Sequence, residues 1–67
     1  MKVTVNGDGR EFDGESLSLG EVLEALGLGG HPVVVEHNGS ALLPGEQAGT
    51  VVRDGDQLEI VRVVAGG

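Results

Sequence analysis

Alternating apolar and polar residues near both ends of the chain predict β-strands. Residues 2–5 place Val3 and Val5 on one side, and residues 57–64 place Leu58 and Ile60 on one side. Successive side chains of a strand point to opposite faces, so each segment should bury one face. We expect the last segment, the longest, at the centre of the sheet. Turn residues separate further predicted strands at 10–12, 33–37, 40–43 and 50–53.

One segment has the spacing of an amphipathic helix. Its apolar residues fall at positions i, i+3, i+4 and i+7, namely Leu19, Val22, Leu23 and Leu26. Ser18 and Glu21 fit a capping box, and Gly27 stands where a left-handed C-cap belongs. The pattern predicts a helix over 19–26. Strands around a single helix form an α+β order, and we expect a mixed sheet with this helix on one face and water on the other.

Composition limits what such a domain can do. The chain has 67 residues, 39% of them apolar, and its one aromatic residue is Phe12. One small core without a deep pocket argues against an enzyme, and we expect a domain over 1–64 with no cofactor of its own. Cysteine is absent, which excludes disulfides, thiolate nucleophiles and Cys-ligated metals. His31, Glu36 and His37 do not suggest a metal site either, because alternation sends the last two to opposite faces.

The net charge of the chain limits the kinds of partner that it can bind. The formal net charge is −7, which repels phosphate backbones and anionic membranes, so we expect neither nucleic acid nor membrane binding. The first residues contain no apolar run long enough for a signal peptide or a membrane span, and we expect a cytoplasmic protein.

The sequence ends in Gly66-Gly67, and this ending is the candidate chemical group. Glycine adds nothing to a core, so a frayed end is one interpretation. The functional interpretation is a tail, Ala65 to Gly67, that enters a narrow channel of a partner enzyme. MgATP in the partner would adenylate the carboxylate of Gly67, and a sulfur nucleophile would then displace AMP. In a chain without Cys, this terminus is the plausible place to carry sulfur.

A docking surface is expected beside that tail. If Leu58 and Ile60 face the core, alternation leaves Glu59, Val61 and Val63 on the open face of the sheet. Exposed valines next to a reactive tail are suited to anchor a partner while the tail reaches in.

Residues 54–67, the Asn38-Gly39 turn, the Leu43-Pro44 step and the chain length together resemble the ThiS family of sulfur carriers. The resemblance covers essentially the whole chain. It implies a ubiquitin-like β-grasp fold, adenylation at Gly67 by a ThiF-type enzyme, conversion to a thiocarboxylate, and sulfur delivery to thiazole synthase. The sister family, the small subunit of molybdopterin synthase, usually has a Pro-Pro pair before its diglycine, where this chain has Val63-Val64.

Other functions stay open at this level. The carrier could serve another sulfur-bearing product, such as a thiosugar, cysteine or molybdopterin. A ubiquitin-like protein modifier would join Gly67 to a lysine of another protein. A purely structural binding domain is a third class.

Overall fold

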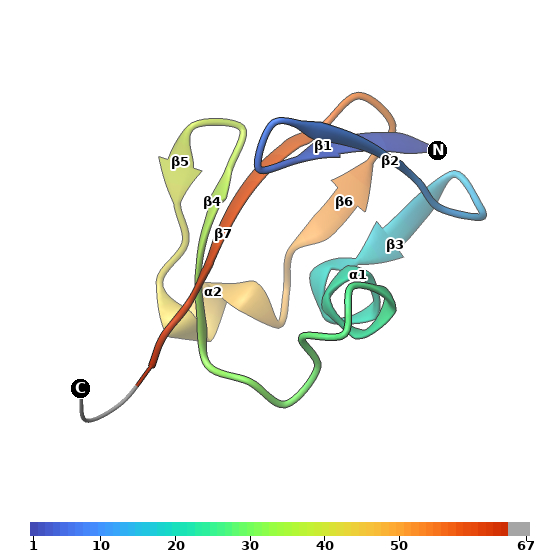
Figure 1. Cartoon of the computed structure of the whole chain (residues 1–67). Coiled ribbons are helices and arrows are strands. Elements are labelled where there is room, and N and C mark those ends of the chain that lie inside the picture. Colours follow the sequence, from blue (N-terminus) through green and yellow to red (C-terminus); the bar gives the residue numbers. More distant parts are fainter. Residues whose placement is uncertain (65–67) are drawn as a thin grey trace.

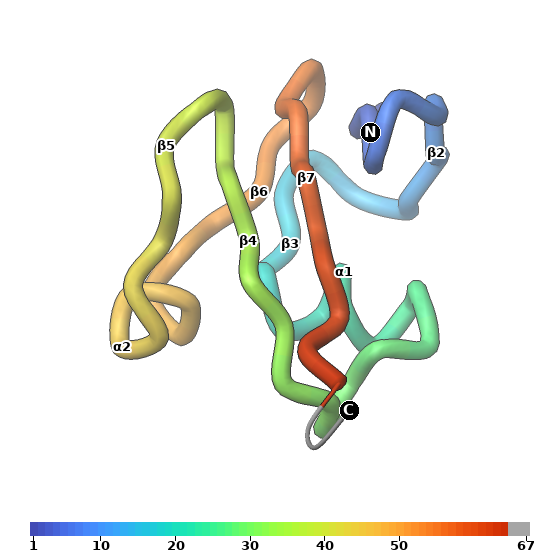
Figure 2. The backbone as a smooth tube through the Cα atoms, turned by 60° about the vertical axis from the view of Figure 1, so that its left-hand side comes forward, coloured from blue at the N-terminus to red at the C-terminus, as the bar shows by residue number. Residues whose placement is uncertain are grey.

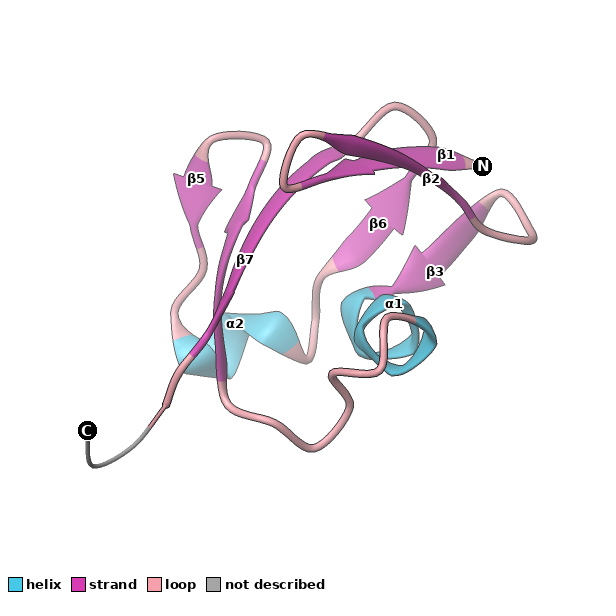
Figure 3. Ribbon diagram, viewed as in Figure 1, coloured by secondary structure: helices cyan, strands magenta, loops and turns pink. Residues whose placement is uncertain are grey.

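The computed structural model describes residues 1–64, and the predicted tail of Ala65, Gly66 and Gly67 lies outside the described residues. Residues 1–64 form seven strands and two helices (Figures 1 and 3). The strands are β1 (Lys2–Val5), β2 (Asp8–Glu11), β3 (Ser16–Ser18), β4 (Val33–His37), β5 (Ser40–Ala41), β6 (Val51–Arg53) and β7 (Gln57–Arg62). The helices are α1 (Leu19–Ala25) and α2 (Pro44–Gln47). Neither described helix has the length and apolar character needed to cross a membrane.

Strand β7 lies at the centre of the main sheet, as predicted. The strand order in this sheet is β2-β1-β7-β4-β5. Strand β7 runs parallel to β1 and antiparallel to β4, so the sheet is mixed. The short strands β3 and β6 pair antiparallel in a second, two-stranded sheet. This arrangement confirms the predicted α+β fold with a mixed sheet.

Helix α1 begins where its capping residues predict. The Ser18 hydroxyl accepts a hydrogen bond from the Glu21 amide at 3.1 Å, and the Glu21 carboxylate accepts one from the Ser18 amide at 3.2 Å. This reciprocal pair satisfies two backbone donors that the first turn leaves open. The helix ends at Ala25, one residue earlier than predicted, and Gly27 follows it with a φ of 78°.

The core lies between α1 and one face of the main sheet. Figure 1 shows α1 on one side of the sheet and no helix on the other. The helix contributes Leu19, Val22 and Leu23, and β6 contributes Val52. The sheet contributes Val3, Val5, Val35, Leu58 and Ile60. The opposite face of the sheet, which we call the open face, is therefore available to a partner.

Several boundaries differ from the prediction. The turn predicted over residues 6–9 is only Asn6-Gly7, with φ values of 50° and 86°, and β2 therefore starts at Asp8. Positive φ at two central residues is typical of a tight hairpin whose twist matches its strands. Strand β2 ends before Phe12, which still packs against the core half-buried.

The segment after β5 was also predicted incompletely. Pro44 was expected to break the pattern, but it begins the short helix α2, since proline is tolerated in a first helical turn. Strand β3 was not predicted, because three residues are too few to show a period. Strand β5 stops at Ala41, β6 begins at Val51, and β7 stops at Arg62, two residues before the predicted end.

Candidate functional site

Strand β7 presents alternate residues to the core and to the open face. Leu58 and Ile60 are 1% and 6% exposed, whereas Val61 is 64% exposed. Glu59 and Val63 are exposed as well. The three residues predicted to dock a partner therefore lie on the side of the sheet that faces water, and their docking role stays a prediction.

The structure extends this surface onto neighbouring strands. Val34 of β4 lies directly opposite Val61 and is 53% exposed. Continuing the Glu36–Ala41 register of β4 and β5 by two residues brings Leu43, 67% exposed, next to Val34. Leu43, Val34 and Val61 thus form a line of exposed apolar side chains across three neighbouring segments, which we call the apolar row. Exposed apolar side chains grouped in this way mark interaction sites more often than scattered ones do.

Two glutamates border the apolar row. Glu36 and Glu59 are directly opposite each other on β4 and β7, and both are exposed. Like charges in direct cross-strand positions destabilise a sheet. Among residues 1–64, a salt bridge is found between His37 and Asp56 but not at either glutamate, so no described basic side chain neutralises Glu36 or Glu59. The open face therefore combines apolar contact area with negative charge, which complements a partner surface that has basic residues around an apolar centre.

The end of β7 lies beside the loop that leads into β4. Figure 2 shows the two segments next to each other. The Val63 amide donates a hydrogen bond to the Pro32 carbonyl at 2.9 Å, one residue beyond each strand. This bond holds the base of the predicted tail two residues past Val61. The apolar row and Val63, from which the sequence continues toward Gly67, therefore lie near the same end of the sheet.

A polar cluster ties together two turns at the opposite end of β7. The His37 Nε2 atom lies 2.7 Å from the Asp56 Oδ2 atom, and Asn38 donates to Oδ1 of the same carboxylate at 3.2 Å. Burial alone would raise the pKa of Asp56. The hydrogen bonds from His37, Arg53 and Asn38 and the charge of a protonated His37 outweigh burial and hold that pKa below its usual range.

This cluster has the properties of a structural connection. Asp56 also accepts from the Arg53 amide at 2.9 Å, so its carboxylate is occupied by groups of its own chain. Within residues 1–64, no three His, Cys, Asp or Glu side chains are grouped closely enough to hold a metal ion. Strand β7 separates the cluster from the base of the tail by about 20 Å at 3.3 Å per residue. The sequence missed the pairing of His37 with Asp56, which depends on how two distant turns meet.

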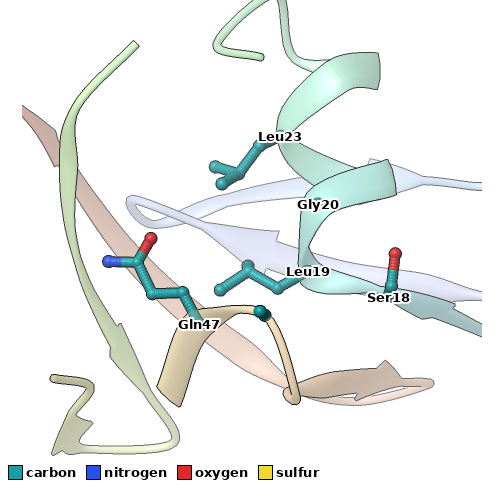
Figure 4. A pocket seen from close by; sticks show the side chains of 6 residues that line it. Ser18, Leu19, Gly20, Leu23 and Gln47 are labelled. Atoms are coloured by element: carbon teal, nitrogen blue, oxygen red, sulfur yellow. The ribbon is translucent and has the colours of Figure 1, made fainter. Parts of the chain in front are cut away.

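A hollow on the helical side of the sheet is a second candidate (Figure 4). The side chains that line it include Leu19 and Leu23 of α1 and Gln47 of α2. Its polar groups are already used: Ser18 caps α1, and Gln47 donates to the Val33 carbonyl at 3.1 Å. The hollow offers a small apolar surface whose Ser18 and Gln47 side chains already form hydrogen bonds within the chain. The open face is therefore the better candidate site.

Comparisons with known proteins agree with this geometry. The sequence profile of the ThiS family matches residues 3–67. A crystal structure of a thiamine biosynthesis protein (ThiS) from Geobacter metallireducens is 40% identical, with full coverage of both chains and a TM-score of 0.82. A solution structure of a thiamine biosynthesis protein from the same organism is 40% identical, with a TM-score of 0.78 over 100% of this chain and 88% of that one.

The chain is also similar to a segment of a much longer curated protein. A thiazole synthase from Paramagnetospirillum magneticum is 37% identical over 67 residues, which are 100% of this chain and 20% of the relative. The chain thus spans about a fifth of the length of the curated relative that it matches.

Proposed function

This chain belongs to the ThiS family, and from that premise we propose that it is a sulfur carrier of thiamine biosynthesis, a co-substrate of partner enzymes. The observation that carries the proposal is the position of the apolar row. Exposed Val34 and Val61 lie on the strand pair whose end leads directly to Gly66 and Gly67. A carrier needs this combination, because one surface must anchor the partner while the terminus reaches its active site.

The proposed chemistry takes place at the carboxylate of Gly67, outside the described residues. A free carboxylate is a poor electrophile, because its oxide is a very poor leaving group. In a ThiF-type enzyme, a carboxylate oxygen attacks the α-phosphorus of MgATP, pyrophosphate leaves, and an acyl-adenylate forms. Hydrosulfide supplied by the sulfur source then attacks the carbonyl carbon, AMP leaves, and loss of the sulfur-bound proton gives the thiocarboxylate. The proposal places these steps in the cytoplasm, where ATP is available.

Docking supplies the positioning for this chemistry. Val61 and Val63, with Val34 and Leu43 beside them, provide the apolar contact area, and Glu59 and Glu36 provide negative charge at its edge. Such complementary charge raises the rate of encounter more than it tightens a complex. The tail without bulky side chains then extends into a channel of the partner.

Thiazole synthase is the proposed acceptor of the sulfur. Support comes from the relative with that name, in which a segment similar to this whole chain occupies a fifth of the length. The relatives favour thiamine over a thiosugar, cysteine or molybdopterin as the destination. Protein conjugation through Gly67 is the function to separate by experiment, because it begins with the same adenylate.

The test uses the intact protein with a ThiF-type enzyme, MgATP and a sulfur source. We expect intact-protein mass spectrometry to show one oxygen replaced by sulfur at the C-terminus, a gain of about 16 Da from the atomic masses of the two elements. Higher-mass conjugates in a cell lysate, without a thiocarboxylate, would point instead to a protein modifier.

A deletion of Gly67 is the matched control. The shortened terminus ends about 3.5 Å from the position that the α-phosphate requires, so the variant should not be adenylated although its fold survives. Circular dichroism checks the fold. Adenylation of this variant at the rate of the intact chain would refute the proposed role of Gly67.

A further inference from the structure

The hydrogen-bond ladder between β4 and β7 ends differently at its two ends. In an antiparallel pair, alternate residue pairs exchange two N–H···O bonds. At the end far from the tail, the Asn38 amide donates to the Gln57 carbonyl at 2.8 Å, and the Gln57 amide donates to the Asn38 side-chain oxygen at 2.8 Å. At the tail end, the Val63 amide donates to the Pro32 carbonyl at 2.9 Å. The second bond of this pair would need an N–H at residue 32.

Proline cannot supply that N–H. The register pairs Val34 with Val61 and Glu36 with Glu59. Because hydrogen-bonded pairs recur at every second residue, Pro32 and Val63 occupy the next hydrogen-bonded position of the ladder. Any other residue at position 32 would therefore direct an amide hydrogen toward the Val63 carbonyl. Pro32 ends the ladder one bond early, at the point where the chain leaves the sheet.

We propose that Pro32 is a positioning residue that ends the pairing of the chain with the sheet at Val63, so that the segment after Val63 can enter the activating enzyme. This inference rests on the proposed function of Gly67. A second bond from residue 32 would hold the Val63 carbonyl and move the release point one residue along, which shortens the free segment by about 3.5 Å. Fewer tail conformations would then reach the active site, and the apparent affinity falls with the fraction that is competent.

The variant Pro32→Ala tests the inference, because alanine restores the N–H without adding bulk. Pro44→Ala is the matched control: it removes the other proline of the chain, which begins α2 and is not part of the β4–β7 ladder. In the full chain, hydrogen exchange should show a protected Ala amide at position 32. In adenylation by a ThiF-type enzyme with MgATP, the KM for Pro32→Ala should rise about 2- to 10-fold with kcat unchanged, as expected for one hydrogen bond. The KM of Pro44→Ala should equal that of the unmodified chain.

A change in KM without a change in kcat would distinguish a positioning role of Pro32 from a purely structural one. If Pro32 only stiffens its loop, Pro32→Ala would lower the melting temperature and leave KM unchanged, which overturns the inference. An unprotected amide at position 32 overturns it as well, because the additional bond would not have formed. An unmodified chain that is not adenylated refutes the proposed function and the inference with it. An unmodified chain that is adenylated with the same KM as Pro32→Ala refutes the inference alone.

Discussion

Ile60 and Val61 are neighbours in sequence on opposite faces of β7. Aspartate should therefore disrupt folding at position 60 and partner binding at position 61. Ile60 is 6% exposed, whereas Val61 is 64% exposed. Removing a buried isoleucine side chain costs about 2–5 kcal/mol, and an unpaired buried carboxylate adds several more. A domain of 67 residues has about 3–10 kcal/mol of stability at 0.05–0.15 kcal/mol per residue. Ile60→Asp should therefore unfold the domain.

Val61→Asp should leave the domain folded, with a change in unfolding free energy within about 0.5 kcal/mol, as is usual for an exposed side chain. If Val61 anchors the activating enzyme, its loss should cost about 1–2 kcal/mol of binding, or about 5- to 30-fold in kcat/KM for adenylation. Val61→Asn separates the loss of apolar contact from the added charge. Urea unfolding and adenylation kinetics measure the two effects on the same samples.

Val51→Asn is the matched control, an exposed valine on β6 in the other sheet. Its kcat/KM should equal that of the unmodified chain. Equal destabilisation by Ile60→Asp and Val61→Asp would show that the faces of β7 are assigned wrongly. A folded Val61→Asn with unchanged kcat/KM would refute the docking role of the open face.

Three further predictions concern charge, pH and capping. Glu36→Gln with Glu59→Gln should raise the melting temperature by relieving cross-strand repulsion, yet slow association with the activating enzyme at low salt; stopped-flow rates at two salt concentrations check this, and an unchanged rate would contradict it. Asp56 has a lowered pKa in the folded state, so its contribution to stability is complete above the unfolded pKa of about 3.9 and is lost as the pH falls through the folded pKa. Asp56→Asn should accordingly destabilise at pH 7 and progressively less as the pH falls below about 3.9 in urea titrations, and a loss that does not change with pH would contradict the lowered pKa of Asp56. Ser18→Ala should cost about 1 kcal/mol in the same measurement because it removes the N-cap, and no loss would show that the cap adds no stability.

The parts of the fold that sequence predicted are those with a complete local signal. The apolar spacing from Leu19 and the Ser18–Glu21 capping box placed α1 to within one residue. The alternation around Leu58 and Ile60 identified β7 and its buried face. Local patterns determine these features, so no knowledge of the partner strands was needed.

The parts that sequence missed depend on contacts between distant segments. Strand β3 is defined by its pairing with β6, because Leu17 lies opposite Val52. The apolar row needs the register of β4 against β7, which brings Val34 next to Val61. The alternation within residues 33–37 could have placed Val34 on an exposed face, but the residue opposite it could not be read from one strand.

The central position of β7 also determines when the protein can fold during synthesis. Strand β7 pairs with both β1 and β4, yet six of the described strands are translated before it. Without Leu58 and Ile60 the sheet has a gap at its centre, and β1 has no neighbour on that side. Pairing of β1 with β7 closes a loop of more than fifty residues, so the main sheet can assemble only after β7 has been translated. A ribosome that stops before β7 therefore releases a chain that cannot form the main sheet and is open to proteolysis.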